Sequence, residues 1–389
     1  MNPLEKKLTE CLKEATERQE AAGINVLVLQ NGEELGYAEA GMANLAAGKP
    51  ITRDAIFRLY SQTKPVTAAA VMMLVERGKI DLLDGVDKFL PGFGHPRVIA
   101  ADGTETPTLR APWILELLGM TAGVCYPDVD AAGQCAARVF AEDQERILAG
   151  NGMDTVSFCN RLGEQPLAFQ PGTHWRYSTS ADILGAVVEV VSGKRFSRFL
   201  REELFEPLGM KDTAFWVPPE KRDRFVTVYD HTAAGLTEWR NLHLAVGKYD
   251  EEPAFESGGA GLVSTLDDYA AFAGMLLRGG VTRDGKRLLS EATVRYMTTP
   301  QLSEDVRKDM WDALNGYSYS CLMRVCDRPG AAGLLTRKGE YGWDGWLGTY
   351  FCNIPDQGIT FLLGQNVTNA GTTAVTRKCR NLVAAALGI

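Results

Sequence analysis

The sequence predicts one mixed α/β fold, in which both ends of the chain build a sheet and a mainly helical part is inserted between them. Strand-like runs occur at residues 24–40 and 317–365, whereas helical stretches fill the middle. The chain has 389 residues, of which 45% are hydrophobic and 23% charged, so it can bury a sizeable core. We therefore predict a discontinuous sheet domain, residues 1–60 and 255–389, and a mainly helical domain with lid-like loops, residues 61–254.

The N-terminal segment predicts an amphipathic helix followed by a β-hairpin. Side chains that suit a buried face recur there at helical spacing, namely Leu4, Leu8, Cys11, Leu12 and Ala15. A β-rich run from Ile24 to Gln30 follows, and a second run extends to Ala40. Asn31-Gly32 lies between the two runs, and Asn-Gly in this position is the strongest short signal of a hairpin.

Residues 62–77 predict a helix, because they contain few helix breakers and many alanines and methionines. Gly78 follows, as expected for a residue that ends a helix in the left-handed conformation. Pro65 is compatible with this helix only in or near the first turn, where the backbone N–H groups have no helical partner. Ser61 is therefore expected close to the helix N-terminus.

The middle of the chain alternates helices with loops rich in glycine and proline. We predict helices at Ala181–Val191, Phe196–Phe205 and Leu266–Leu277. Residues 218–257 predict a long irregular loop region, suited to a lid or a wall of a site.

Strand patterns return at the C-terminal end. They cover Tyr317–Cys326, Trp346–Ile354 and Ile359–Gln365, and a Pro-Asp-Gln-Gly turn at 355–358 joins the last two. A final helix is expected over Thr373–Leu387. A site at the junction of the sheet and the helical part is expected, because ligand clefts often lie between such parts.

Charge and composition exclude several classes of protein. The formal net charge is −8 and no long basic run occurs, which argues against a nucleic-acid partner. No apolar run approaches the ~18 residues of a membrane span, and the N-terminus lacks the pattern of a signal peptide. We therefore predict a cytoplasmic protein with no membrane partner, in which the sequon at Asn366 stays unused; its oligomeric state is left open.

The eight cysteines are scattered, with no CxxC pair and no cysteine–histidine cluster at zinc spacing. We expect reduced, mostly buried thiols rather than a disulfide framework. The prediction is also that the protein holds no metal and needs no cofactor.

Ser61 and Lys64 carry the clearest chemical signal. They are three residues apart and share one helix face. A serine hydroxyl needs an adjacent base to become a nucleophile, and a lysine can be that base if burial or positive charge lowers its pKa. The helix N-terminus also offers N–H groups and positive potential to a developing oxyanion. Alone, S-x-x-K often arises by chance, as a helix cap followed by a solvated lysine.

Two further segments change this interpretation. Residues 171–179 precede a helix that opens at Ser180, and residues 339–349 precede a β-hairpin. Separately, Tyr177 could be an ordinary amphipathic aromatic and the glycine-rich segment an ordinary start of a strand. Together and in this order, the three segments resemble the serine β-lactamase and penicillin-binding-protein superfamily, most closely class C β-lactamases and family VIII carboxylesterases. That family carries S-x-x-K, then a Tyr-x-Asn-type motif, then a Lys-Thr-Gly-type motif on an edge strand.

Other segments add to the resemblance, which covers nearly the whole chain. They are Val86–Pro91, Gln170–Gly172, Pro207–Met210 and Gly258–Thr265. The resemblance implies a β-lactamase-like fold, a mixed antiparallel sheet flanked by helices, with Ser61 at the junction of the two parts.

The resemblance also implies roles for individual residues. Ser61 would be the acylated nucleophile, and Lys64 would take its proton or lower its pKa. Tyr177 would relay a proton to the leaving group and then help to activate the hydrolytic water. The oxyanion hole would consist of the backbone N–H groups of Ser61 and Trp346.

The chain departs from the β-lactamase pattern in its second and third motifs. Thr179 stands where asparagine is usual, which removes an amide suited to an acylamino side chain. Trp343-Asp344-Gly345 occupies the Lys-Thr-Gly position, as Trp-x-Gly does in family VIII esterases. Trp343 lacks the charge that binds a carboxylate, and Asp344 would repel one. We therefore expect these four residues to bind substrate, with an apolar wall, no compensating cation and a preference for neutral short-chain esters.

The leading hypothesis is a serine hydrolase that cleaves small esters through an acyl-enzyme on Ser61. Alternatives on the same residues are a β-lactamase, a D-amino-acid amidase or peptidase, and an acyltransferase; another is a catalytically inactive binding protein. The absence of G-x-S-x-G argues against an α/β-hydrolase, and the four histidines offer neither H-E-x-x-H nor a triad context. His174 is expected either to line the site or, more simply, to have a structural role.

Overall fold

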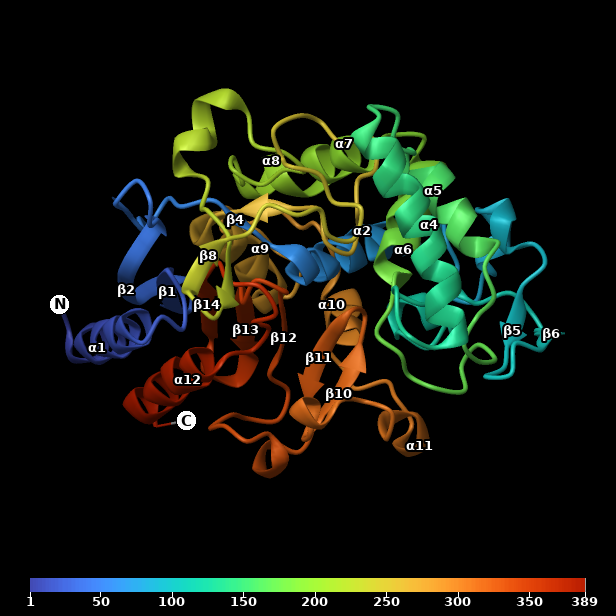
Figure 1. The fold of residues 1–389 in the computed structure, drawn as a ribbon. Helices are drawn as coiled ribbons and strands as arrows, with labels where there is room; N and C mark the ends of the chain where they lie inside the picture. The colour runs from blue at the N-terminus through green and yellow to red at the C-terminus, as the bar shows by residue number, and fades with distance from the viewer. Residues whose placement is uncertain (389) are drawn as a thin grey trace.

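An antiparallel sheet of eight strands forms the centre of the structure, a computed structural model that describes residues 1–388. The strand order is β10-β11-β12-β13-β14-β1-β2-β3, so the two ends of the chain meet where β14 pairs with β1 (Figure 1). Val26 lies opposite Leu363 in this central pair. The predicted mixed α/β fold, with a sheet built from both termini, is confirmed.

The strands of the large sheet are mostly short. They are β1 (Gly23–Gln30), β2 (Glu33–Asn44), β3 (Lys49–Pro50), β10 (Tyr317–Ser320), β11 (Met323–Cys326), β12 (Tyr341–Asp344), β13 (Tyr350–Ile354) and β14 (Ile359–Gly364). Three small ribbons pair β4 (Phe57–Arg58) with β9 (Val263–Ser264), β5 (Arg97–Ile99) with β6 (Glu105–Pro107), and β7 (Tyr229–Thr232) with β8 (Gly235–Glu238).

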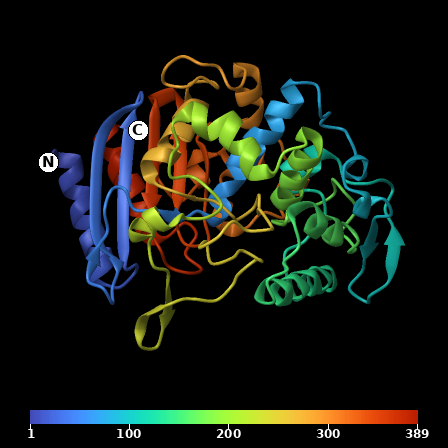
Figure 2. The same cartoon turned by 90° about the horizontal axis from the view of Figure 1, so that it is seen from above.

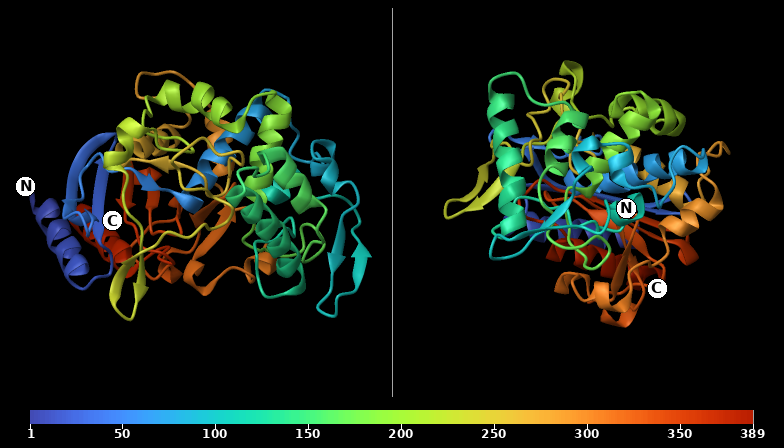
Figure 3. Two further views of the ribbon diagram at one scale, coloured as in Figure 1. Left: turned by 45° about the horizontal axis from the view of Figure 1, so that its top comes forward. Right: turned by 90° about the vertical axis from the view of Figure 1, so that its right-hand side faces the viewer.

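Helices cover both faces of the sheet and form the middle of the chain (Figures 2 and 3). They are α1 (Pro3–Glu17), α2 (Lys64–Glu76), α3 (Ile114–Leu118), α4 (Ala131–Leu148), α5 (Thr155–Gly163), α6 (Ser180–Ser192), α7 (Phe196–Leu200), α8 (Glu206–Leu208), α9 (Leu266–Leu277), α10 (Glu291–Met297), α11 (Glu304–Arg307) and α12 (Ala374–Leu387). Within the described residues, no helix is both long and apolar enough to cross a membrane.

Alternate side chains of the central strands pack against different helices, as the two faces of a sheet require. Val26 and Leu363 belong to the apolar cluster that includes α1 and α12. Leu27 and Leu362 belong to the larger cluster that includes α2 and α9. The first and last helices therefore share the outer face of the sheet, whereas α2 and α9 lie on the inner face.

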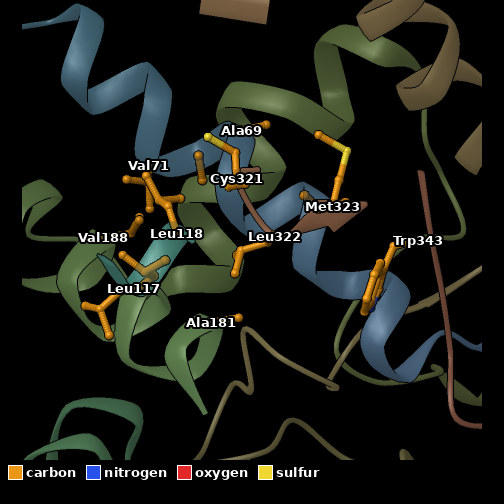
Figure 4. Close-up of a cluster of buried hydrophobic side chains, with 14 of the residues drawn as sticks. Ala69, Val71, Leu117, Leu118, Ala181, Val188, Cys321, Leu322, Met323 and Trp343 are labelled. Atoms are coloured by element: carbon orange, nitrogen blue, oxygen red, sulfur yellow. The ribbon is translucent and has the colours of Figure 1, made fainter. Parts of the chain in front are cut away.

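Helix α2 is buried on all sides between β12 and α6. Every residue from Lys64 to Leu74 is buried, and Figure 4 shows Val71 of α2 beside Leu118 of α3 and Val188 of α6. A helix that is apolar all round belongs in the interior. Lys64, its first residue, is therefore held in an environment that disfavours charge.

The hairpin turn and the two ends of the helix predicted in the N-terminal half are confirmed. Asn31 and Gly32 have φ values of 51° and 83°, the left-handed pair that a two-residue hairpin of this type needs. Gly78 has φ 65° and follows the end of α2. Pro65 lies in the first turn of that helix.

Some predicted elements differ from those observed. Residues 317–326 form the hairpin β10–β11 rather than one strand, because Cys321 and Leu322 take left-handed φ values of 40° and 62°. The predicted helix Phe196–Phe205 is α7 followed by a π-helical turn. The region 218–257 is largely irregular, as predicted, but includes the ribbon β7–β8.

The third motif does not lie on an edge strand, so that expectation is wrong. Strand β12 is interior to the sheet, between β11 and β13. However, β11 pairs only with Tyr341 and Gly342, whereas Trp343 and Asp344 pair with β13 alone. The end of β12 that carries the motif is therefore free on one side. The proposed domain boundaries after residues 60 and 254 stay a prediction.

Candidate active site

Ser61 lies in a 3-10 turn, Tyr60–Thr63, that leads directly into α2. Tyr60 is buried and has φ 45°, a conformation that costs a bulky residue on the order of 1–2 kcal/mol. The turn is held because Leu59 donates its backbone N–H to Leu262 and accepts one from Gln62. The surrounding fold thus keeps the half-buried serine on a strained bend at the start of a helix.

Lys64 is completely buried and points its amine at Ser61. Its Nζ lies 3.2 Å from Ser61 Oγ, 3.0 Å from the Tyr126 hydroxyl and 2.9 Å from the carbonyl oxygen of Gly259. Burial lowers the pKa of Lys64 from its usual 10.5 to about 7, against the opposing influence of Asp182. A substantial fraction of Lys64 is therefore neutral at physiological pH, and a neutral amine can accept the serine proton.

A buried carboxylate stands behind the lysine. Asp182 of α6 accepts hydrogen bonds from the Ser257 hydroxyl at 2.5 Å and from the Gly259 N–H at 3.0 Å. Burial raises the pKa of Asp182, and the nearby Lys64 opposes that rise. A Cβ at Gly259 would lie 2.9 Å from both Asp182 and the Tyr126 hydroxyl, so only glycine fits between these groups.

Tyr177 completes the group around the serine. Its hydroxyl accepts a hydrogen bond from Trp343 Nε1 at 3.0 Å, and its ring centroid lies 4.6 Å from Lys64 Nζ. Burial raises the pKa of Tyr177, although hydrogen bonds with Ser61 and Trp343 act in the opposite direction. The phenol is therefore neutral near pH 7 and keeps a proton that it can donate.

Trp343 is not the exposed apolar wall expected from the sequence. Its side chain is only 2% exposed, and its indole N–H is directed at the Tyr177 hydroxyl. Trp343 therefore supplies a hydrogen-bond donor at the place where the related lysine would supply an ammonium. The indole N–H thus orients the phenol of Tyr177, and a substrate-binding role of Trp343 stays a prediction.

Asp344 is paired with a buried arginine, which weakens the repulsion of anions that the sequence indicated. Arg324 Nη1 lies 3.3 Å from Asp344 Oδ2, and the Thr372 hydroxyl also donates to this oxygen. Arg324 lies opposite Gly342 in the sheet, which makes Asp344 its diagonal neighbour on the same face. The arginine is only 3% exposed, and it offsets much of the repulsion that Asp344 alone would exert.

The segment after β12 brings a free N–H group to the serine turn. Gly345 donates to the carbonyl of Thr349 at 2.7 Å, and a Cβ at Gly345 would lie 2.2 Å from the carbonyl oxygen of Leu59. Across residues 1–388, the backbone N–H groups of Ser61 and Trp346 have no hydrogen-bond acceptor. Two unpaired donors at these positions fit the predicted oxyanion hole.

Thr179 and His174 both contact other protein groups. The Thr179 hydroxyl donates to the carbonyl of Cys125 at 3.2 Å and is buried, so it supports the loop that carries Tyr126. The His174 side chain is 58% exposed and contacts Asp309 at 3.0 Å. Both contacts are structural, and the substrate-binding role of Thr179 stays a prediction.

The sequence patterns did not indicate a role in the site for three residues, namely Tyr126, Asp182 and Gly259. Tyr126 lies in an irregular loop, and no spacing relates it to Ser61. Asp182 falls five residues after Tyr177, in the first turns of α6, a position that an N-terminal helix charge would also explain.

Aromatic side chains surround the candidate site. Trp311 is 49% exposed and packs edge-on against Tyr177, with ring centroids 5.0 Å apart. His243 stacks on Trp346 at 4.0 Å, and burial lowers the pKa of His243 to about 4, so this imidazole is neutral. His243 and Trp239 belong to the region predicted as a lid or wall, and both pack against Trp346.

Comparisons with known proteins agree with the family that the three motifs indicate. The Beta-lactamase family model matches residues 8–386. Protein Rv1367c of Mycobacterium tuberculosis is 32% identical over 339 residues, covering 85% of this chain and 81% of that protein. Esterase EstB of Burkholderia gladioli is 31% identical over 378 residues, covering 92% and 89%. The solved structure of EstCE1, a hydrolase with promiscuous acyltransferase activity, has a TM-score of 0.82 at 25% identity and covers 98% of each chain.

The family match includes the serine turn, the tyrosine segment and the end of β12, which the fold brings together around Ser61. The resemblance inferred from the three motifs is thereby confirmed, as is the β-lactamase-like fold. The chain belongs to the β-lactamase family and is a serine hydrolase of that family.

Proposed function

We propose that the protein hydrolyses small neutral carboxylic esters through an acyl-enzyme on Ser61. The observation that carries this proposal is the buried Lys64 amine, 3.2 Å from Ser61 Oγ, with a pKa lowered to about 7. A lysine in this state can deprotonate a serine at neutral pH, which an exposed lysine cannot do.

Acylation begins when neutral Lys64 accepts the proton of Ser61 and Oγ attacks the ester carbonyl. The negative charge that develops on the carbonyl oxygen is stabilised by the N–H groups of Ser61 and Trp346. The C–O bond to the alcohol then breaks as the Tyr177 hydroxyl donates its proton to the leaving oxygen. Tyr177 regains a proton from the Lys64 ammonium, so that the acyl-enzyme forms with both groups in their starting states.

Deacylation reverses these transfers with water in place of the alcohol. The Tyr177 hydroxyl accepts the proton of the attacking water and passes its own proton to Lys64. The bond between Ser61 Oγ and the acyl carbon then breaks as the Lys64 ammonium returns a proton to Oγ, so that the acid is released and all three side chains regain their starting states. The protein contributes its own side chains and backbone to every transfer. Within the described residues, no group of three His, Cys, Asp or Glu side chains is arranged to hold a metal ion.

The preference for neutral substrates follows from the charges around the third motif. Trp343 donates a hydrogen bond without a charge, and the guanidinium of Arg324 is buried and paired with Asp344. A substrate carboxylate would thus lose its hydration without gaining a free cationic partner. Efficient cleavage of β-lactams or of peptides with a free carboxylate is therefore disfavoured, and the related esterase EstB supports the ester assignment.

Acyl transfer to an alcohol is the second candidate function. Trp311 presents a half-exposed indole beside Tyr177, the group that would deprotonate an attacking hydroxyl. An organic alcohol can pack against this ring, whereas water gains nothing from it. The acyltransferase activity named for the similar EstCE1 is consistent with this candidate.

The test is a panel of p-nitrophenyl esters of increasing acyl length, measured beside nitrocefin and D-alanine p-nitroanilide. We expect kcat/KM to be highest for short neutral esters, and a fluorophosphonate to label Ser61. Addition of an alcohol should divert part of the acyl group to a new ester if transfer competes with hydrolysis. If nitrocefin is cleaved as efficiently as the best ester, the protein is a β-lactamase. Failure of the fluorophosphonate to label Ser61 would instead favour an inactive binding protein.

A further inference from the structure

Two cysteine side chains meet where the first and last helices pack together. Cys11 lies on α1 and Cys379 on α12, and these helices contact each other on the outer face of the sheet (Figures 1 and 3). The Cys379 thiol donates a hydrogen bond to the Cys11 sulfur, with an Sγ–Sγ distance of 3.9 Å. Among the described residues, no other cysteine makes a hydrogen bond to a second thiol.

The two sulfur atoms differ in exposure and in ease of ionisation. Cys11 is half-buried, whereas Cys379 is completely buried. The hydrogen bond from Cys379 lowers the pKa of Cys11 to about 7; burial opposes this shift, Lys378 adds to it, and Glu14 and Glu20 oppose it. The same hydrogen bond, together with burial, raises the pKa of Cys379.

This asymmetry is the arrangement that thiol–disulfide exchange requires. The attacking sulfur must be a thiolate that the reagent can reach, and Cys11 meets both conditions. A second thiol must lie close behind to displace the reagent from the mixed disulfide, and Cys379 is in that position. Formation of the disulfide requires the Sγ–Sγ distance to contract from 3.9 Å to ~2.05 Å.

We propose that Cys11 and Cys379 form a redox latch, which reacts with a small-molecule disulfide and then joins the two ends of the chain. The Cys11 thiolate attacks one sulfur of the reagent, forms a mixed disulfide and releases one thiolate. Cys379, as its proton leaves, attacks the Cys11 sulfur and displaces the second thiol. Overall, two protein thiols are oxidised to one disulfide, and the reagent is reduced to two thiols.

The latch closes nearly the whole chain into one covalent loop. A cross-link over so long a loop removes much of the freedom of the unfolded chain and stabilises the fold. The site lies on the face of the sheet that carries α1 and α12, opposite the face on which α2 presents Ser61. The latch therefore does not depend on the proposed ester hydrolysis.

The test is incubation of the full chain with oxidised glutathione at pH 8, followed by peptide mapping without reduction. We expect one disulfide between the peptides that contain Cys11 and Cys379, loss of two of the eight free thiols, and a higher Tm that dithiothreitol reverses. A wild-type protein without this cross-link overturns the proposed site. A cross-linked protein with unchanged Tm overturns its action as a latch.

Single variants separate the two steps. Cys379→Ser should stop after the first step and keep glutathione on Cys11, whereas Cys11→Ser should leave Cys379 unmodified because no accessible thiolate remains. Cys135→Ser, on the distant helix α4, is the matched control and should still form the cross-link. The reverse pattern, with glutathione on Cys379 in Cys11→Ser, would refute the assigned order. Activity on a p-nitrophenyl ester and the circular dichroism spectrum report whether each variant is folded.

Discussion

The buried amine of Lys64 should leave a measurable signature in the pH dependence of stability. Below pH 7, Lys64 is protonated in both the native and the unfolded chain, so the native state bears the full penalty of a buried charge. Above pH 7, the native lysine loses its proton while the unfolded lysine keeps it up to pH 10.5. The unfolded state then binds more protons, and the stability of the native protein rises with pH across this interval.

The size of the effect follows from the pKa itself. Its fall from 10.5 to about 7, at about 1.36 kcal/mol for each pH unit, amounts to about 5 kcal/mol over the whole interval. Lys64→Met removes the titrating group and keeps most of the side-chain volume. The free energy of unfolding of wild type should therefore gain about 2 kcal/mol relative to Lys64→Met between pH 7.5 and pH 9.

Equilibrium unfolding in urea at pH 6, 7.5 and 9 measures this difference, with Lys79→Met as a control at an exposed lysine. The control should follow the pH dependence of wild type. In parallel, kcat/KM for p-nitrophenyl butyrate should rise with pH through a midpoint near 7 in wild type. Parallel stability curves for wild type and Lys64→Met, or a rate that rises only above pH 9, would refute the assignment of Lys64 as a neutral base.

Three further outcomes are expected from substitutions around the site. Ser61→Ala should lose fluorophosphonate labelling and reduce turnover by several orders of magnitude with an unchanged fold; retention of more than about a tenth of the activity would rule out a covalent nucleophile. Trp343→Phe should reduce kcat about tenfold, the effect of one lost hydrogen bond, yet add nothing in a Tyr177→Phe background; equal losses in both backgrounds would show that the indole does not act through Tyr177. Trp311→Ala should raise KM for esters of aromatic alcohols by about 3- to 10-fold and leave kcat nearly unchanged; an equal rise for ethyl and aromatic esters would remove Trp311 from the substrate path.

The parts of the fold that could be predicted are those that neighbouring residues determine. The Asn31-Gly32 hairpin and the end of α2 at Gly78 depend on φ values that few residues other than glycine and asparagine adopt. The break at Cys321 and Leu322 could not be predicted in this way. Cysteine and leucine rarely adopt a left-handed backbone conformation, so no local signal marks this turn. Contacts with distant parts of the chain impose it; for example, Leu322 donates its backbone N–H to the carbonyl of Leu118.

The residues of the candidate site also differ in whether neighbouring sequence or distant contacts determine their positions. Ser61, Lys64 and Tyr177 belong to motifs in which spacing or order carries information. Tyr126 contacts Lys64 from a loop 62 residues away, and its position is fixed by long-range packing that no local pattern expresses. Asp182 is linked to the site by hydrogen bonds to the segment that contains Gly259. The sequence of α6 alone does not predict this contact.

Asp344 illustrates why the charge of a site cannot be judged from a motif alone. In the sequence it is a carboxylate next to a tryptophan, and repulsion of anionic substrates is the natural inference. Its partner Arg324 is 20 residues away, and the register of β11 on β12 makes the two diagonal neighbours, with only Gly342 opposite the arginine. Since the pair cancels much of its own field, selection against anions depends on the lack of a free cation rather than on active repulsion. The same pairing explains why the donor to Tyr177 can be an uncharged indole: a lysine at position 343 would add a second buried cation beside Arg324, whereas Trp343 supplies the hydrogen bond without that cost.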